Sequence, residues 1–216
     1  MSEHSIFVSA ASASPILSAI KVSPSAVVPV NTNITATATI ADLDLPNDNH
    51  TAEWTWDDGN TSAGSVSGTT VTGNHTYAAV GVYKVRLTVR DKFGNTATAT
   101  FEYVVVYDPS AGSVTGGGWI WSPKGAYVAN RELEGKANFG FVSKYQKGAS
   151  VPTGQTEFQF HAANLNFKSQ SYEWLVITGG SKAQFKGVGT INGSGNYGFL
   201  LTAIDGALLE KPGPDM

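Results

Sequence analysis

The sequence contains no cysteine and few charged residues. The absence of cysteine from all 216 residues excludes disulfides, thiolate metal sites and thiol catalysis, and it leaves the redox compartment unspecified. Charged residues make up 14% of the chain, against about 25% in an average globular protein. The polarity must therefore come mainly from Thr, Ser, Asn and Gly, a composition typical of β-sheets and turns.

Neither a strong net charge nor a long apolar run is present. The chain has 14 Lys and Arg against 17 Asp and Glu, so its net charge of −3 offers no basic surface for a nucleic-acid backbone. No window approaches the roughly 18 apolar residues that a membrane span requires, and no basic segment followed by an apolar stretch opens the chain. We therefore predict no nucleic-acid partner, no membrane partner and no signal peptide in this sequence.

What the sequence does contain is short apolar runs of period two, bounded by Gly, Pro, Asn or Asp. Over 34–40, apolar residues alternate with threonines, which is typical of a half-buried antiparallel strand. Trp54 and Trp56 form another pair predicted to point inward, and an apolar run over 82–89 ends at a turn over 91–95. Because helical periodicity is nearly absent, we predict an all-β protein.

Aromatic residues spaced by two recur in the second half of the chain. Alternate residues of a strand share a face, so each pair is predicted to lie on one face of its strand. The pairs are Trp119 and Trp121, Phe139 and Phe141, Phe158 and Phe160, Tyr172 and Trp174, and Tyr197 and Phe199. We expect the four phenylalanines of 139–160 to be core residues. Hairpin connections are expected at 161–164, 179–182 and 193–196.

A turn-rich joint over 107–112 separates the two β patterns. Seven or so short strands within about 90 residues are what an immunoglobulin-like sandwich needs. We therefore predict two β-sandwich domains, the second of which is a small antiparallel sandwich or barrel. The expected boundaries are a flexible leader over 1–16, an immunoglobulin-like domain over 17–108, and a second β domain over 109–216 that ends in an irregular tail.

Two motifs in the first half resemble those of the PKD domain, an immunoglobulin-like module of many secreted microbial enzymes and surface proteins. The motifs are the segment WTWDDG at 54–59 and the segment HTYAAVGVYKVRLTVRD at 75–91. The resemblance covers roughly residues 17–107 and implies an extracellular module. In such a module Asp58 and Gly59 form a turn, while Tyr77 and Tyr83 bury their rings with hydroxyls that reach the backbone.

The second half is similar to a small β module of bacterial secreted proteins known as post-COAP-1. The segments that carry this similarity are 115–120, 136–141, 189–193 and 203–205. Members of that module continue into further strands where this chain turns into 206–212, so the resemblance implies that the last strands are missing. An open sheet edge exposes unpaired N–H and C=O groups, and we therefore expect a homo-oligomer that forms through that edge.

The resemblance to PKD-like modules also implies a calcium site, because such modules in secreted collagenases hold calcium between an early loop and the strand before the last hairpin. The matching residues are Asp42, Asp44, Asp48 and Asp91. Ca²⁺ takes about six to eight oxygens, of which acidic residues on two adjacent loops could supply three or four. The alternative is that Asp42 and Asp91 cap turns and the other two are solvated. Calcium is the one cofactor that the sequence suggests.

Histidines provide the route to an enzymatic interpretation. His50, His75 and His161, with Glu53 or Asp57 nearby in sequence, are residue types that could hold a transition metal or activate a water. No metal-binding spacing joins them, and His50 and Glu53 fall on opposite faces of an expected strand. His75 belongs to the PKD-like motif, so its expected role is structural.

Exposed aromatic rings could instead form a stacking platform for sugars. The candidates are Trp119, Trp121, Tyr127 and Trp174, which are accompanied by Asn and Gln residues. The alternative is that these rings fill the interior of a small domain that has no disulfides.

The function that this sequence favours is that of a non-catalytic accessory module of a secreted or surface bacterial protein, acting as a spacer, in adhesion or in carbohydrate binding. Its expected location is extracellular, and its expected partner is a polysaccharide or a cell-surface protein. The alternative is a metal-dependent hydrolase that uses the histidines and carboxylates on the β scaffold.

Overall fold

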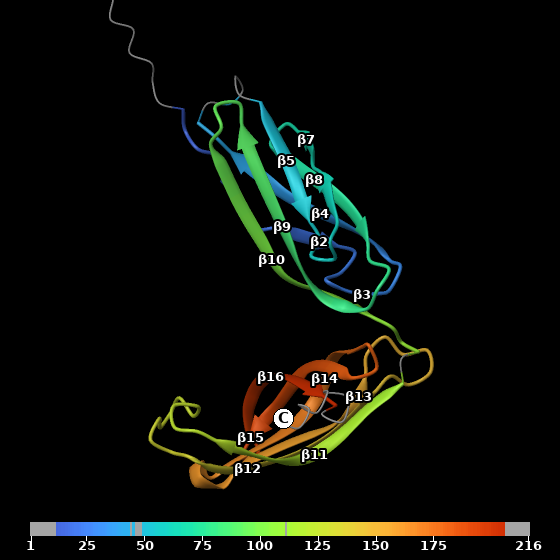
Figure 1. Cartoon of the computed structure of the whole chain (residues 1–216), viewed down its shortest axis with the longest axis vertical. Coiled ribbons are helices and arrows are strands. Elements are labelled where there is room, and N and C mark those ends of the chain that lie inside the picture. The colour runs from blue at the N-terminus through green and yellow to red at the C-terminus, as the bar shows by residue number, and fades with distance from the viewer. Residues whose placement is uncertain (1–11, 44, 46–48, 111, 206–216) are drawn as a thin grey trace, which may run out of the picture. The chain divides into compact units, whose positions relative to one another are not determined.

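The structure is a computed structural model that describes residues 12–43, 45, 49–110 and 112–205 (Figure 1). Strands account for most of the described chain, and the only helical element in these residues is the 3-10 turn η1 (His161–Ala163). No helix within the described ranges is both long and apolar enough to cross a membrane. The prediction of an all-β protein is confirmed.

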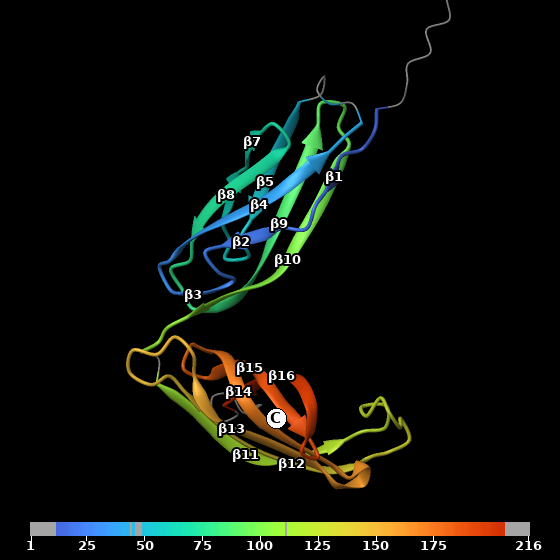
Figure 2. The ribbon, with the colours of Figure 1, turned by 180° about the vertical axis from the view of Figure 1, so that it is seen from behind.

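The strands form three sheets. The first five-stranded sheet contains β1 (Ile16–Leu17), β2 (Lys21–Ser23), β4 (Asn33–Ala41), β7 (Ser65–Ser67) and β8 (Thr70–Thr76) (Figure 2). The second five-stranded sheet has the order β3 (Val27–Pro29), β10 (Thr96–Tyr107), β9 (Gly81–Asp91), β5 (His50–Thr55) and β6 (Thr61–Ala63). The six-stranded sheet has the order β11 (Ser113–Ser122), β12 (Gly135–Lys144), β13 (Thr153–Phe160), β14 (Leu165–Thr178), β15 (Lys182–Ile191) and β16 (Ser194–Ile204).

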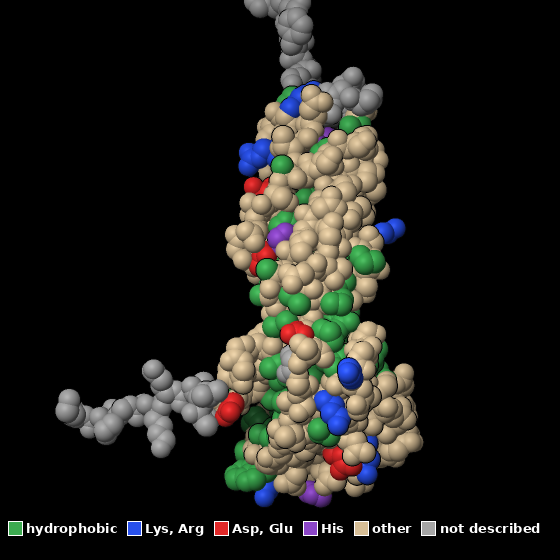
Figure 3. Space-filling model, turned by 90° about the vertical axis from the view of Figure 1, so that its right-hand side faces the viewer, with side chains coloured by type: hydrophobic (Ala, Val, Ile, Leu, Met, Phe, Trp, Pro, Cys, Tyr) green, Lys and Arg blue, Asp and Glu red, His purple; other side chains and the backbone are tan. Residues whose placement is uncertain are grey.

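The chain divides into two compact units. The described residues within 12–26, 31–77 and 82–104 form the first unit, and those within 27–30, 78–81 and 105–205 form the second. The division falls within β10, because β3 pairs in parallel with the last residues of that strand. On the face shown in Figure 3, Lys, Arg, Asp and Glu side chains are scattered rather than gathered into one large patch, as the low charge content predicts.

The first two sheets face each other across an apolar core. In β4 the alternation predicted from the sequence is confirmed, since Ile34, Ala36, Ala38 and Ile40 are all buried. Trp54 on the opposite sheet is fully buried, and its indole ring packs directly over Gly73 of β8. A bulkier residue at Gly73 would occupy the space that the ring fills. This contact between a large ring and a bare backbone sets how closely the two sheets approach.

The second unit is a meander in which each strand pairs antiparallel with the next. The connection between β15 and β16 is Asn192-Gly193, with φ of 52° and 76°, which are the two positive values that a tight hairpin turn requires. The turn therefore overlaps the predicted segment 193–196 only at Gly193, and residues 194–196 already belong to β16. Residues 161–164 form a connection as predicted, and the other predicted connection covers 179–181, because Lys182 already begins β15.

The six-stranded sheet curls around an apolar groove, so it forms an incompletely closed barrel rather than a sandwich. Phe160 is buried as predicted, with 2% of its surface exposed. The prediction for Phe139, Phe141 and Phe158 is wrong, because these rings line the groove and are only half-buried. Residues from β11 and β16 also line it, and these two strands do not pair with each other.

We expect the substitution Gly73→Ala to lower the free energy of unfolding of the first unit by about 1–3 kcal/mol, because the added methyl group would overlap the Trp54 ring. The measurement is urea denaturation of the full chain followed by tryptophan fluorescence. Gly198→Ala on β16 is the control, since a methyl group there meets no atom within 4 Å. An unchanged free energy of unfolding for Gly73→Ala would contradict a tight contact between the Trp54 ring and Gly73.

Candidate functional site

Two tryptophans on β11 are largely exposed. Trp119 and Trp121 keep 60% and 59% of their surface in contact with solvent. They are two residues apart on one strand, so their side chains project from the same face at a spacing of roughly 7 Å. Lys136 lies opposite Trp121 on β12, and its Nζ is 5.0 Å from the centroid of the Trp119 ring. This cation–π contact holds the Trp119 ring in a defined orientation.

The hydrogen-bonded register places polar side chains beside these rings. Trp119 is paired with Asn138 on β12, and Asn138 is paired with Gln159 on β13. Paired residues of antiparallel strands share a face, so one row of side chains runs from the indole across two amides. Phe139 and Phe158 point to the other face, into the groove. The row therefore lies on the outer face of the sheet.

The neighbouring row contains a gap in which side chains are missing. Gly117 is paired with Gly140, which is paired with Glu157. A Cβ atom at Gly140 would meet nothing within 4 Å, so the surface is open there. A shallow hollow of about 380 Å³ lies over this position. Its lining includes Asn138, Gly140, Val142, Gln155, Glu157 and Gln159.

This surface combines flat apolar rings with hydrogen-bonding groups of both kinds. Side-chain amides both donate and accept hydrogen bonds, and a carboxylate accepts them. Glu157 is also paired with Lys168, with 3.3 Å between Oε1 and Nζ, and about half of each side chain is exposed. Such a set of groups fits an uncharged ligand that has apolar faces and many hydroxyls. We refer to Trp119, Trp121, Asn138, Glu157 and Gln159 as the outer-face site.

Only half of the predicted aromatic platform belongs to this site. Tyr127 is half-buried, with its ring edge-on to Phe160 at 6.1 Å. Trp174 is 4% exposed, which excludes its ring from a surface platform. The prediction that Tyr172 and Trp174 share a face is also wrong, because the register with β15 shifts between these two residues. A bulge of this kind reverses the alternation on which the sequence argument relied.

His50 and His75 lie far apart within the first unit. His50 pairs with Asp42 at one end of β4, with 2.9 Å between Nε2 and Oδ2. His75 lies opposite Ile34, near the other end of that nine-residue strand, which is roughly 25 Å away. His161 is exposed in η1 of the second unit. No cluster of three or more His, Asp or Glu suited to a metal occurs among the described residues, so the hydrolase alternative gains no support.

The described aspartates of the expected calcium site are already engaged. Asp42 is hydrogen-bonded to His50. Both carboxylate oxygens of Asp91 accept hydrogen bonds from Asn95, and Oδ1 also accepts the Phe93 N–H. Burial raises the pKa of Asp91, but these hydrogen bonds outweigh it and hold the pKa below its ordinary value. Asp91 therefore caps the turn over 91–95 through these hydrogen bonds.

The other two aspartates of the expected calcium site, Asp44 and Asp48, lie outside the described residues. Calcium binding by this loop accordingly stays a prediction.

The motif residues at the other end of the first unit form a structural cluster. His75 donates from Nε2 to Oδ2 of Asp58 over 2.8 Å, and its ring stacks on Trp56 at 4.8 Å between centroids. The Tyr77 hydroxyl donates to the Trp56 carbonyl over 3.0 Å. Burial raises the pKa of Tyr77 well above its usual range, and so this hydroxyl stays protonated. The predicted structural role of His75 fits these contacts.

Asp58 is the charged group of this cluster. It also accepts hydrogen bonds from the backbone and side chain of Asn60, each 3.0 Å long. Partial burial by itself raises the pKa of Asp58, but the hydrogen bonds from Asn60 and His75 outweigh it and leave the pKa below the ordinary value of 3.8. The ionised form of Asp58 is therefore stabilised in the folded chain.

These contacts lie within the segment that the comparison with known families picks out. Residues 19–105 match the PKD domain. The PKD domain is an immunoglobulin-like module, in agreement with the two facing sheets seen here. No family match supports the post-COAP-1 resemblance of the second half, which stays a prediction. A search of curated proteins finds no match to the chain.

Sequence reasoning found Trp119 and Trp121 and expected Asn and Gln beside them, but it did not identify Asn138, Gln159, Glu157 or the open surface at Gly140. The period-two pattern around Asn138 and Gln159 does indicate that they face away from the phenylalanines. It does not say which residue of one strand lies opposite which residue of the next, and that register is what brings these groups together.

Exposure of the two indoles can be measured by acrylamide quenching. Trp54, Trp56 and Trp174 are buried, so we expect quenching of the native chain to come from Trp119 and Trp121. In the double variant Trp119→Phe and Trp121→Phe, the Stern–Volmer slope should fall to that of buried tryptophan. Equal slopes for the variant and the native chain would contradict the exposure of these rings.

The low pKa of Asp58 predicts an acid-dependent loss of stability in the segment that matches the PKD domain. Unfolded Asp58 takes up its proton near pH 3.8, while folded Asp58 does so only at lower pH, so the unfolding free energy should fall as the pH drops below about 4. Asp58→Asn should flatten this decline, as measured by urea denaturation between pH 2 and 6. Glu102→Gln is the control, because Glu102 forms an exposed pair with Lys84. A steep decline that survives in Asp58→Asn would assign it to other groups.

Proposed function

We propose that this chain is a non-catalytic accessory module of an extracellular protein, and that the outer-face site binds a polysaccharide. The match of residues 19–105 to the PKD domain supports the first part, because PKD domains are typically extracellular immunoglobulin-like modules. The observation that supports the second part is the pair of exposed tryptophans on one face of β11 beside two amides and a carboxylate.

The chemistry of a glycan chain matches this surface. A pyranose ring has apolar C–H faces, and these stack on an indole and remove apolar area from water. Each half-exposed ring would contribute about 1–2 kcal/mol in this way, less than a fully buried aromatic side chain. Hydroxyls at the edge of the sugar ring can bond to Asn138 and Gln159 in the row of the Trp119 indole, and to Glu157 in the neighbouring row.

The PKD domain has a different role in this proposal. Its core is filled by Trp54, Trp56 and Tyr77, which are almost fully buried, and its polar motif residues are bonded to one another. We infer that it acts as a stable spacer that holds the second unit away from the rest of a larger protein. Attachment to a polysaccharide or cell surface would then depend on the second unit.

The proposal is tested by retention on insoluble polysaccharides, using cellulose, chitin and xylan powders. We expect the native chain to bind at least one of them without releasing reducing ends. The double variant Trp119→Ala and Trp121→Ala should lose affinity by about tenfold or more, because two stacking surfaces are removed. Retention of the variant at the native level would contradict the assignment of the site.

Tyr197→Ala is the matched control for this experiment. Tyr197 is an aromatic residue of the same unit that is 47% exposed, but it lies on β16 and not on the outer-face site. Its removal should leave retention unchanged, which separates loss of a specific site from loss of general surface hydrophobicity.

A further inference from the structure

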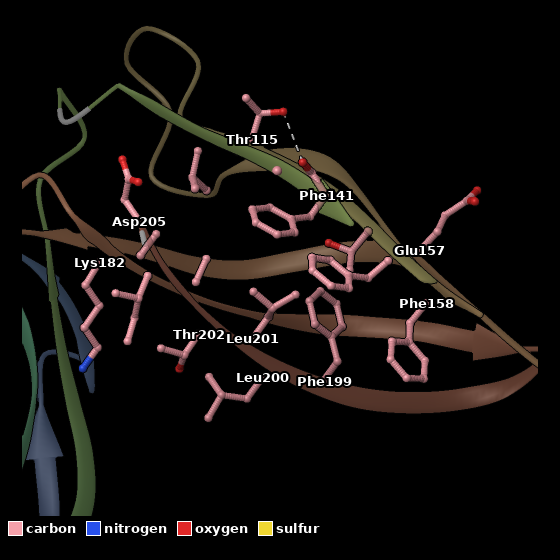
Figure 4. A pocket seen from close by; sticks show the side chains of 18 of the residues that line it. Thr115, Phe141, Glu157, Phe158, Lys182, Phe199, Leu200, Leu201, Thr202 and Asp205 are labelled. Carbon is pink, nitrogen blue, oxygen red and sulfur yellow. Dashed lines mark hydrogen bonds between the residues drawn. The ribbon is translucent and has the colours of Figure 1, made fainter. Parts of the chain in front are cut away.

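The second unit contains a large groove lined mainly by apolar residues. Its volume is about 1100 Å³, and all six strands of the sheet contribute to its lining (Figure 4). Phe139, Phe141, Phe158 and Phe199 line it and are only half-buried. Apolar rings in a folded domain are normally covered by other residues. This face has the composition of a hydrophobic core, but its rings stay partly exposed to solvent.

The groove is bordered by two sheet edges that carry unused hydrogen-bonding groups. Within the described residues, β11 pairs only with β12, and β16 pairs only with β15. Both strands also line the groove, with the segments 113–117 and 199–205. An edge strand presents a row of N–H and C=O groups that can pair with another extended segment. An occupant that pairs with an edge would therefore enter the groove as well.

The side chains of β16 show how such a segment would fit. Phe199 and Leu201 point into the groove toward Phe141, whereas Leu200 and Thr202 point away from it (Figure 4). A strand added antiparallel to β16 would follow the same alternation and direct every second side chain into the groove. The seven positions from 199 to 205 span roughly 23 Å, which an extended segment of about seven residues would match.

Charge restricts the chemistry of the occupant. The charged residues at the border of the groove are Glu157, Lys182 and Asp205. In Figure 4 Lys182 and Asp205 lie at one end, while Glu157 lies toward the other end with its carboxylate directed away from the phenylalanine rings, on the outer face. Between them the lining consists of Phe, Leu, Ala, Gly and other uncharged side chains. A charged group inserted there would be buried without a partner, so the complementary occupant is uncharged along its middle.

We propose that the groove binds an extended, uncharged peptide segment of a partner protein, with alternating apolar side chains, which adds as a strand to β16. A flexible alkyl chain would cover the phenylalanines but would leave the edge N–H and C=O groups unpaired. A peptide strand covers the rings and pairs with the edge at the same time. This interaction does not use the outer-face site, because that site lies on the opposite face of the sheet.

The probe for this proposal is a fluorescein-labelled, amidated nine-residue peptide, Lys-Thr-Val-Thr-Val-Thr-Val-Thr-Lys, whose binding to the full chain is followed by fluorescence anisotropy. We expect saturable binding. Leu201→Lys should lower the affinity by at least about tenfold, because it places a charge in the groove. Thr202→Lys is the matched control, since it adds the same charge to the outer face of the same strand and should change the affinity by less than about twofold.

A second arm uses the native chain, so that it does not depend on the folding of Leu201→Lys. N-methylation of alternate residues of the probe, on the edge facing β16, removes the strand hydrogen bonds and should abolish binding. Equal affinity of the N-methylated probe, or its complete displacement by palmitate with no effect of N-methylation, would overturn the proposal in favour of an apolar-ligand pocket. Binding of neither peptide would overturn it as well.

The other occupants give different results. A chain that is dimeric by size exclusion and becomes monomeric with Leu201→Lys would show that a second copy fills the groove. Peptide binding that appears only after residues 206–216 are deleted would identify that segment of the chain as the occupant. The variant Trp119→Ala and Trp121→Ala should bind the peptide like the native chain, so failure of the polysaccharide site and failure of this proposal can be distinguished.

Discussion

The hydrogen-bonded register of β11, β12 and β13 is the constraint on which the surfaces of the second unit depend. It pairs Trp119 with Asn138 and Asn138 with Gln159, and it places Phe139 and Phe158 on the reverse side. A shift of one residue between two of these strands would exchange the faces of every side chain on one of them. The polar outer-face site and the apolar groove are therefore two consequences of one set of backbone hydrogen bonds.

The sheet uses its two faces for different chemistry because its curvature treats them differently. On the convex side, Gly140 leaves the surface open beside the indole row, because a Cβ atom there would meet nothing within 4 Å. On the concave side, strands from both edges surround the phenylalanines without covering them. The first face suits a hydroxylated ligand, while the second suits an apolar strand that can also satisfy the edge N–H and C=O groups.

In the segment that matches the PKD domain, the polar side chains bond mainly to one another. Asp58, His75 and Asn60 satisfy one another at the end of the sandwich, and Asp91 is satisfied by its own turn. His75 and Asp91, which the sequence offers as candidate ligands, thus form hydrogen bonds that stabilise turns. Because the ionised form of Asp58 is the one that accepts these hydrogen bonds, the stability of this end of the domain is tied to its charge.

Period-two alternation by itself determined the all-β class, the inward residues of β4 and the common face of Trp119 and Trp121, because these depend on neighbours along one strand. Two local motifs carried the resemblance of the first half to the PKD domain. Tertiary structure decided the rest. The bulge before Trp174 reverses a face, the incomplete closure of the sheet leaves three expected core phenylalanines uncovered, and pairing between strands joins Asn138 and Gln159 to Trp119. Register and curvature arise from contacts between distant segments, which no local pattern specifies.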